Sequence, residues 1–142
     1  MILSHFVKHG RSNRRGAAAV EFALVAPVFF VFVFGIIEFG RALMVQQVMV
    51  NAARAGARMA ILCGSTDANV TTTISNYMSA AQISGYSTSI TPDLGTTPPP
   101  GSGTAITVKV SVPWSKVTWT GFLPSEWFTG KTITSSVVMI HE

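Results

Sequence analysis

The chain has 142 residues, a formal net charge of +4, 11% charged residues and a mean hydropathy of +0.43. This length leaves room for one small domain beside a membrane segment, and so apolar a composition excludes a disordered tail. The unbalanced positive charge, Lys8, Arg11, Arg14 and Arg15, lies in the first 16 residues, and the remaining chain carries no net charge. The basic charge therefore belongs to a terminal tail and gives no reason to expect a nucleic-acid partner.

Residues 17 to 37 form an apolar run that contains one charged residue, Glu21, and one helix breaker, Pro27. A helix of this length spans roughly 31 Å at about 1.5 Å per residue, which is enough to cross the hydrocarbon core of a bilayer. Because the excess of Lys and Arg precedes the run, the positive-inside rule places residues 1 to 16 in the cytoplasm and the chain after the run outside it. We therefore expect a single-pass protein of the cytoplasmic membrane.

The helix is expected to continue beyond the membrane. Residues 38 to 62 are rich in good helix formers, and Gly64 follows them as a stop signal. We predict one helix over residues 17 to 62, with its first half in the membrane and its second half outside. Small residues recur every four positions near its end, and we expect them to pack closely on this protein's own sheet; they are Ala52, Ala53, Gly56, Ala57 and Ala60.

Residues 63 to 142 predict a small head outside the cytoplasm, and its first element is a second helix. The segment Ser65-Thr66-Asp67 is typical of a helix N-cap, and Gly85 is expected to end the helix. The apolar residues between these two points have helical spacing, which favours an amphipathic helix; they are Val70, Ile74, Tyr77, Met78 and Ala81.

Three stretches rich in β-branched residues follow, at residues 86 to 92, 104 to 112 and 131 to 142. The Pro- and Gly-rich segment between the first two is short enough for a hairpin loop. An aromatic segment, residues 113 to 130, precedes the third, and we expect it to cover a small sheet or to offer a contact patch. The predicted fold is therefore α+β: a long N-terminal helix packed with a second helix on a small antiparallel sheet of about three strands.

The sequence offers no constellation for catalysis or metal binding. The histidines, His5, His9 and His141, lie towards the chain ends, and the acids outside the apolar run form no obvious pair. We interpret the single cysteine, Cys63, as a small apolar residue at a helix end rather than a nucleophile. The prediction is a non-enzymatic protein without a cofactor, a metal or a small-molecule substrate.

Glu21 is the most informative residue of the apolar run. A carboxylate costs about 2.5–3.5 kcal/mol near the bilayer centre and less near the interface. Glu21 therefore either reaches the cytoplasmic headgroups or has a partner within the membrane. If a protease cut after Gly16, Ala17 would become the N-terminus, and its new ammonium group could pair with Glu21 of a neighbouring chain and offset the burial of both.

Three segments carry a resemblance to a known family: RRGAAAVEFALVAPVF (14–29), GIIEFGR (35–41) and NAARAGARMA (51–60). They resemble the TadE-like family of pseudopilins, minor components of the Tad/Flp branch of type IV pilus systems. The likeness is strong over residues 14 to 60, and beyond them only the order of a helix and a few strands agrees. It implies a non-enzymatic subunit that acts in the assembly or structure of a pilus for tight adherence.

The resemblance also assigns roles to residues. It implies cleavage between Gly16 and Ala17 by a membrane prepilin peptidase of the aspartic type, and N-methylation of the new terminus is common among relatives. Glu21, followed by Phe22 in the family's leader pattern, is implied to serve subunit registration or membrane extraction during assembly. The implied partners are the cytoplasmic membrane, the prepilin peptidase and other pilin-like subunits.

Two arginines in the last segment depart from the family pattern in their surroundings. Ala55 stands where many relatives have an acid, which leaves Arg54 and Arg58 without a local partner. They form either a solvated face or a contact with a second pilin-like subunit, and Arg41 joins them as a possible subunit contact.

Two alternative interpretations also fit the sequence. The chain could be a secreted binding protein in which residues 1 to about 42 are a signal peptide, although no good cleavage motif follows the apolar stretch. It could also be a simple membrane-anchored sensor or lectin-like domain that keeps residues 1 to 16 and tolerates loss of the charge at Glu21. The pseudopilin reading divides the chain into a leader (1–16), a helix (17–62) and a head (63–142).

Overall fold

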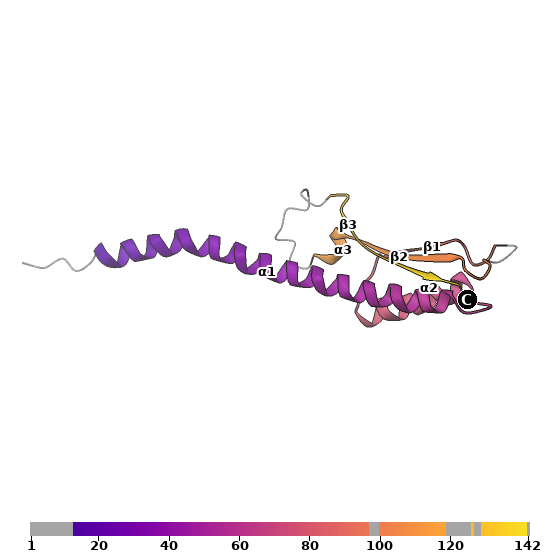
Figure 1. Ribbon diagram of the computed structural model, residues 1–142. Coiled ribbons are helices and arrows are strands. Elements are labelled where there is room, and N and C mark those ends of the chain that lie inside the picture. The colour runs from indigo at the N-terminus through magenta and orange to yellow at the C-terminus, as the bar shows by residue number, and fades with distance from the viewer. Residues whose placement is uncertain (1–12, 97–99, 119–125, 127–128, 142) are drawn as a thin grey trace, which may run out of the picture. The chain divides into compact units, whose positions relative to one another are not determined.

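The computed structural model describes residues 13–96, 100–118, 126 and 129–141. The chain divides into two compact units, residues 1–36 and 37–142, and each is described by itself. The elements in chain order are the helices and strands α1 (Asn13–Ala60), α2 (Asp67–Ala80), β1 (Ser87–Thr91), β2 (Ala105–Pro113), α3 (Trp114–Val117) and β3 (Thr132–Ile140) (Figure 1). This is the α+β fold that the sequence predicts.

Helix α1 is one uninterrupted helix of 48 residues that continues through Pro27. It begins at Asn13, earlier than the expected start at Ala17, because no proline or turn signal separates the basic tail from the apolar run. It ends at Ala60, two residues before the predicted end at residue 62. Gly64 adopts a φ of 76° in the turn that follows, four residues beyond the end of the helix, so it shapes this turn rather than capping α1 directly.

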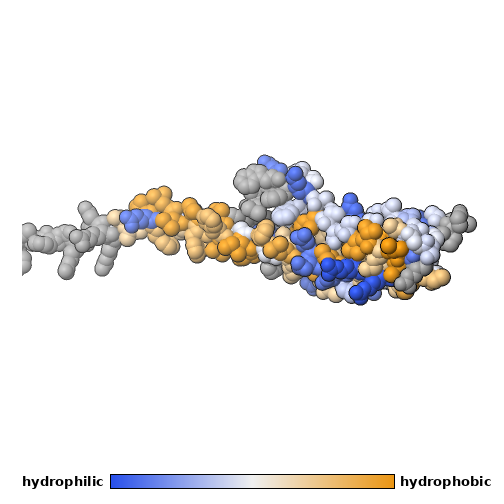
Figure 2. Space-filling view, in the orientation of Figure 1, coloured by the Kyte–Doolittle hydropathy of each residue, from blue (hydrophilic) through white to orange (hydrophobic). Residues whose placement is uncertain are grey.

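The first unit presents an apolar helix surface. Within α1, an 18-residue window reaches a mean hydropathy of 2.5, and none of that window is buried. Phe22, for example, is 71% exposed. Figure 2 shows apolar residues covering this part of α1. Contiguous apolar surface of this extent is unfavourable in water and typical of contact with lipid or protein. By length and composition α1 can therefore serve as a single-pass membrane anchor.

In the second unit, α2 has the expected start but an earlier end. The hydroxyl oxygen of Thr66 accepts a hydrogen bond from the backbone N–H of Asn69 at 3.4 Å, which caps the helix. The helix ends at Ala80 rather than near Gly85, because Gln82 adopts a φ of 56° and the backbone N–H of Ile83 bonds back to the carbonyl of Met78 at 2.9 Å. This is a Schellman-type end with glutamine in the position that glycine usually takes.

The three predicted strands are present and form one antiparallel sheet in the order β1-β2-β3. Central strand β2 alternates between buried and less buried residues, and its four inward side chains are fully buried: Ile106, Val108, Val110 and Val112. Val108 pairs with Ile90 of β1 on one side and with Val137 of β3 on the other. The alternation in the sequence therefore identifies the face of the sheet that meets the core.

The core joins this face of the sheet to α2 and to the part of α1 that lies in the second unit. At Gly56 the two helices approach closely, since a Cβ atom there would lie 2.9 Å from Cδ1 and Cγ1 of Ile74. The small residues of α1 thus pack within the chain, as expected, but at Gly56 the neighbour is α2 rather than the sheet. Figure 1 shows α2 running alongside this end of α1.

The aromatic segment is described only in part. It begins with the short helix α3, in which Val117 is 1% exposed and Trp114 packs against the core. The remaining aromatic residues lie outside the described residues, so the prediction of a cover or contact patch stays a prediction for them; they are Trp119, Phe122, Trp127 and Phe128.

Candidate functional site

The expected processing and assembly residues all lie in the first unit. Gly16, Ala17, Glu21 and Phe22 are exposed residues of α1. A Cβ atom at Gly16 would have no neighbour within 4 Å. Ala17 and Glu21 are four residues apart and therefore share one face of the helix. The arrangement leaves the peptide bond after Gly16 uncovered by the described residues of the first unit.

Arg41, expected as a subunit contact, makes a contact inside the head. Its Nε donates a hydrogen bond to the backbone carbonyl oxygen of Val117 at 2.8 Å, and the bond is partly buried. Glu38, one turn earlier on α1, is 2% exposed. Glu38 and Arg41 are three residues apart, a spacing in the sequence that places two side chains on one face of a helix.

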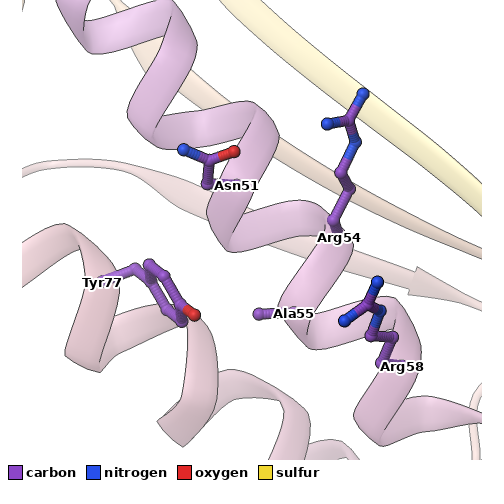
Figure 3. Close-up of a pocket in the computed structure, with 5 residues that line it drawn as sticks. All are labelled: Asn51, Arg54, Ala55, Arg58 and Tyr77. Carbon is purple, nitrogen blue, oxygen red and sulfur yellow. The ribbon is translucent and has the colours of Figure 1, made fainter.

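Arg54 and Arg58 remain on the surface. They line an open groove of about 360 Å³ together with Asn51, Ala55 and Tyr77. Figure 3 shows both guanidinium groups extending from α1, one turn apart, and the Tyr77 hydroxyl directed from α2 toward Ala55. Among the residues that the structure describes, no side chain forms an ion pair or hydrogen bond with either arginine.

Tyr77 is the groove residue whose position its spacing in the sequence does not predict. Its spacing with Val70, Ile74 and Met78 puts it near the apolar face of α2, yet its side chain is 46% exposed while those three are fully buried. The reason is geometric: Tyr77 follows Ile74 by three residues, at the edge of the buried stripe, where α2 borders the open groove lined by α1.

The structure also brings together two acids that looked unrelated in the sequence. Asp67 opens α2 and Asp93 follows β1, and their side chains are close enough for Asp93 to affect the acidity of Asp67. Oδ1 of Asp67 accepts the backbone N–H of Leu94 at 3.2 Å, and Oδ1 of Asp93 accepts that of Gly95 at 2.7 Å. The expectation that the acids form no pair is therefore wrong, because the loop after β1 folds back onto the start of α2.

The carboxyl group of Asp67 has a perturbed acidity. Burial raises the pKa of Asp67 above its ordinary value of 3.8, and the hydrogen bond and charge of Asp93 raise it further against the opposing bond from Leu94. In the described part of the chain, no group of three or more His, Cys, Asp or Glu side chains could hold a metal ion. Cys63 is a free, exposed cysteine just beyond the end of α1.

Together these features define the class of protein: a small α+β head continuous with one long helix that can cross a membrane. Residues 16–58 match the family model described as TadE-like protein. The match confirms the resemblance seen in the sequence and includes Gly16, Glu21 and Arg54; it ends before α2 and the sheet. No curated protein and no solved structure matches the chain. The TadE-like family is pilus-related and is not a known enzyme family, and the match suggests involvement in Tad pilus systems.

Proposed function

We propose that this protein is a non-enzymatic TadE-like pseudopilin that takes part in the assembly or structure of a Tad/Flp-type pilus and thereby in adhesion. The observation that carries the proposal is a basic tail directly before the matched segment, together with Gly16, Ala17 and Glu21 at the start of that segment and of an exposed apolar helix. A plain membrane anchor requires the apolar helix but neither the glycine nor the acid.

In this proposal the chain is inserted once in the cytoplasmic membrane, with residues 1–16 in the cytoplasm and the head on the outer side. The excess of Lys and Arg before the apolar run supports this orientation. A prepilin peptidase of the aspartic type cuts between Gly16 and Ala17. Gly16 suits a protease site because its missing side chain leaves the peptide bond open to a close approach.

Cleavage changes the electrostatics of the helix start. It removes the basic tail and creates an ammonium group at Ala17, four residues before Glu21. A carboxylate near the membrane interior is unfavourable without a partner, and the ammonium group of a neighbouring subunit supplies one. Glu21, with Phe22 beside it, thus favours helix-to-helix assembly of processed chains over isolated chains. The partners are other pilin-like subunits, in the fibre or at its base.

The test is the N-terminal sequence of the membrane-bound chain after co-expression with a prepilin peptidase. We expect the mature chain to begin at Ala17, and we expect Gly16→Leu to retain Met1. Gly40→Leu is the matched control. Gly40 is also an exposed glycine of α1, and a Cβ atom there would contact no other part of the chain within 4 Å. A wild-type chain that still begins at Met1 overturns the proposal and favours an uncleaved anchored domain. A soluble chain that begins after residue 37 favours an ordinary signal peptide.

A further inference from the structure

The groove lined by Arg54 and Arg58 has the composition of a binding surface rather than of a merely solvated helix face. Four of its five lining residues occupy positions 51, 54, 55 and 58, one stripe of α1, and Tyr77 closes it from α2. Arginine and tyrosine are, with tryptophan, the residue types most enriched at the energetic centres of protein interfaces. Tyrosine offers a large apolar ring with a hydroxyl, so it can lose water at low conformational cost.

The charge of the groove is uncompensated by the residues that the structure describes. Arg54 and Arg58 are four residues apart on α1, a spacing at which like charges repel and weaken a helix. The described residues supply no acid to either of them. A partner that brings carboxylates would remove this repulsion, since each planar guanidinium can donate two parallel hydrogen bonds to one carboxylate.

The two walls of the groove are held at a short distance. Gly56 lies next to Ala55 in α1, and its backbone approaches Ile74 of α2 so closely that there is no room for a methyl group without a shift. Ile74 is fully buried one turn before Tyr77. Because this contact sets the separation of α1 and α2 beside the groove, the groove exists before a partner arrives, which lowers the entropy lost on binding.

The position of the groove along α1 distinguishes a protein partner from a lipid surface. The apolar run ends at Ile37, and Arg54 lies 17 residues further, or about 25 Å along a helix. The Debye length at physiological salt is about 8 Å, so headgroup charges at the end of the run act only weakly at that distance. Carboxylates on another protein chain outside the membrane can reach the groove directly.

We propose that the groove between α1 and α2 binds carboxylate side chains of a partner pilin-like subunit, with Arg54 and Arg58 as the charged contacts and Tyr77 as the aromatic one. The identity of the partner as a pilus subunit rests on the proposed function, whereas the chemistry of the ligand rests on the groove alone. The contact lies outside the apolar run, so it is separate from the pairing of Glu21 with a processed N-terminus.

Site-specific photo-crosslinking tests this inference with the full chain in the membranes of cells that assemble the pilus. The variant Tyr77→p-benzoylphenylalanine places the reactive ring in the groove. We expect crosslinks that map by mass spectrometry to an Asp- or Glu-containing segment of another pilin-like subunit. The matched position is Thr71, an exposed residue of α2 that does not line the groove, and the same probe there should give no such crosslink.

The second part of the experiment removes the charges of the groove. Combined Arg54→Gln and Arg58→Gln should lower the crosslink yield about tenfold, since two charge-assisted contacts are lost. Raising the salt concentration should lower the crosslink yield of the protein that keeps both arginines and leave the crosslink yield of the double variant unchanged. Combined Lys109→Gln and Lys116→Gln removes the same charge from exposed positions outside the groove and should leave the yield within about twofold.

The outcomes separate this inference from the proposed function. Crosslinks to phospholipid, to a segment without acids, or in a yield insensitive to both arginines overturn the carboxylate groove even if the chain begins at Ala17. A crosslink to an Asp- or Glu-containing segment of a protein outside the pilus machinery overturns the inference that the partner is a pilin-like subunit. A chain that still begins at Met1 overturns the proposed function independently of what the groove binds.

Discussion

Arg41 and Val117 are 76 residues apart in the sequence, yet Nε of Arg41 donates a hydrogen bond to the carbonyl oxygen of Val117 at 2.8 Å. The bond connects α1 to the last residue of α3, from which the aromatic segment continues. Val117 is itself buried in the core. The position of α3 in the head therefore depends on a side chain from the helix that the family match covers.

Arg41→Leu should lower the free energy of unfolding of the head by about 1–3 kcal/mol. The change keeps an apolar stem but removes the donor of a partly buried hydrogen bond to the carbonyl oxygen of Val117. Chemical unfolding of the detergent-solubilised chain, followed by tryptophan fluorescence, measures the difference. Arg54→Leu is the control, because Arg54 is an exposed arginine of the same helix, and it should change stability by about 0.5 kcal/mol or less. Equal effects of the two variants would contradict a structural role for Arg41.

Gly56→Ala should destabilise the head, although alanine is the better helix former by about 1 kcal/mol. A methyl group at Gly56 would lie 2.9 Å from two carbon atoms of Ile74, and Ile74 is fully buried and cannot turn away freely. Overpacking of this kind costs about 1–3 kcal/mol and outweighs the gain in propensity. The same unfolding measurement applies.

The control for this prediction is Gly40→Ala. Gly40 is an exposed glycine of α1, and a Cβ atom there would contact no other part of the chain within 4 Å. Alanine at this position should therefore leave the free energy of unfolding unchanged or raise it by up to about 1 kcal/mol. Ile74→Val, which removes Cδ1, should weaken the effect of Gly56→Ala in the double variant. If Gly56→Ala stabilises the head as much as Gly40→Ala does, the close approach of α1 and α2 does not exclude a methyl group at Gly56, and the prediction is wrong.

Asp67 should give the head a pH dependence of definite sign. Its pKa in the folded head is raised above 3.8, so the folded head holds this proton at a pH where the unfolded chain has lost it. The contribution of this proton to stability is complete below pH 3.8 and disappears as the pH rises through the folded-state pKa. Asp67→Asn keeps an oxygen that can accept the N–H of Leu94 but does not titrate.

The measurement for Asp67 is the free energy of unfolding as a function of pH. Relative to Asp67→Asn, the wild type should lose stability as the pH rises from about 3.8 to neutral. Asp93→Asn should reduce this loss, because it removes the neighbouring charge that raises the pKa of Asp67. A wild type that gains stability over Asp67→Asn in this range would show that Asp67 is stabilised as the anion.

Glu21→Leu should leave membrane insertion intact and impair assembly. Leucine makes the apolar run more uniform, so the anchor is at least as favourable, but the carboxylate partner for a processed N-terminus is lost. Membrane fractionation and counting of pili by electron microscopy measure the two properties. Glu21→Asp, which keeps the charge, should retain more assembly than Glu21→Leu. Normal piliation by Glu21→Leu would support a simple anchor.

Local patterns in the sequence predict much of this fold. The long apolar helix, the cap at Thr66 and the alternation of β2 each depend on residues a few positions apart, so their periods and termini appear directly in the sequence. One departure does not follow from local pattern: α2 ends early because Gln82 takes the left-handed conformation, which is uncommon for a residue other than glycine.

The candidate site divides in the same way. The sequence alone determines the order of basic charge, glycine and acid around Gly16 and Glu21. It also determines the spacing of Arg54 and Arg58. Tertiary structure decided that Arg41 bonds to Val117, that Asp67 meets Asp93, and that Tyr77 stands beside the arginines. These contacts join segments that are far apart in the chain, and helical or strand periodicity within one segment carries no information about which other segment will pack against it.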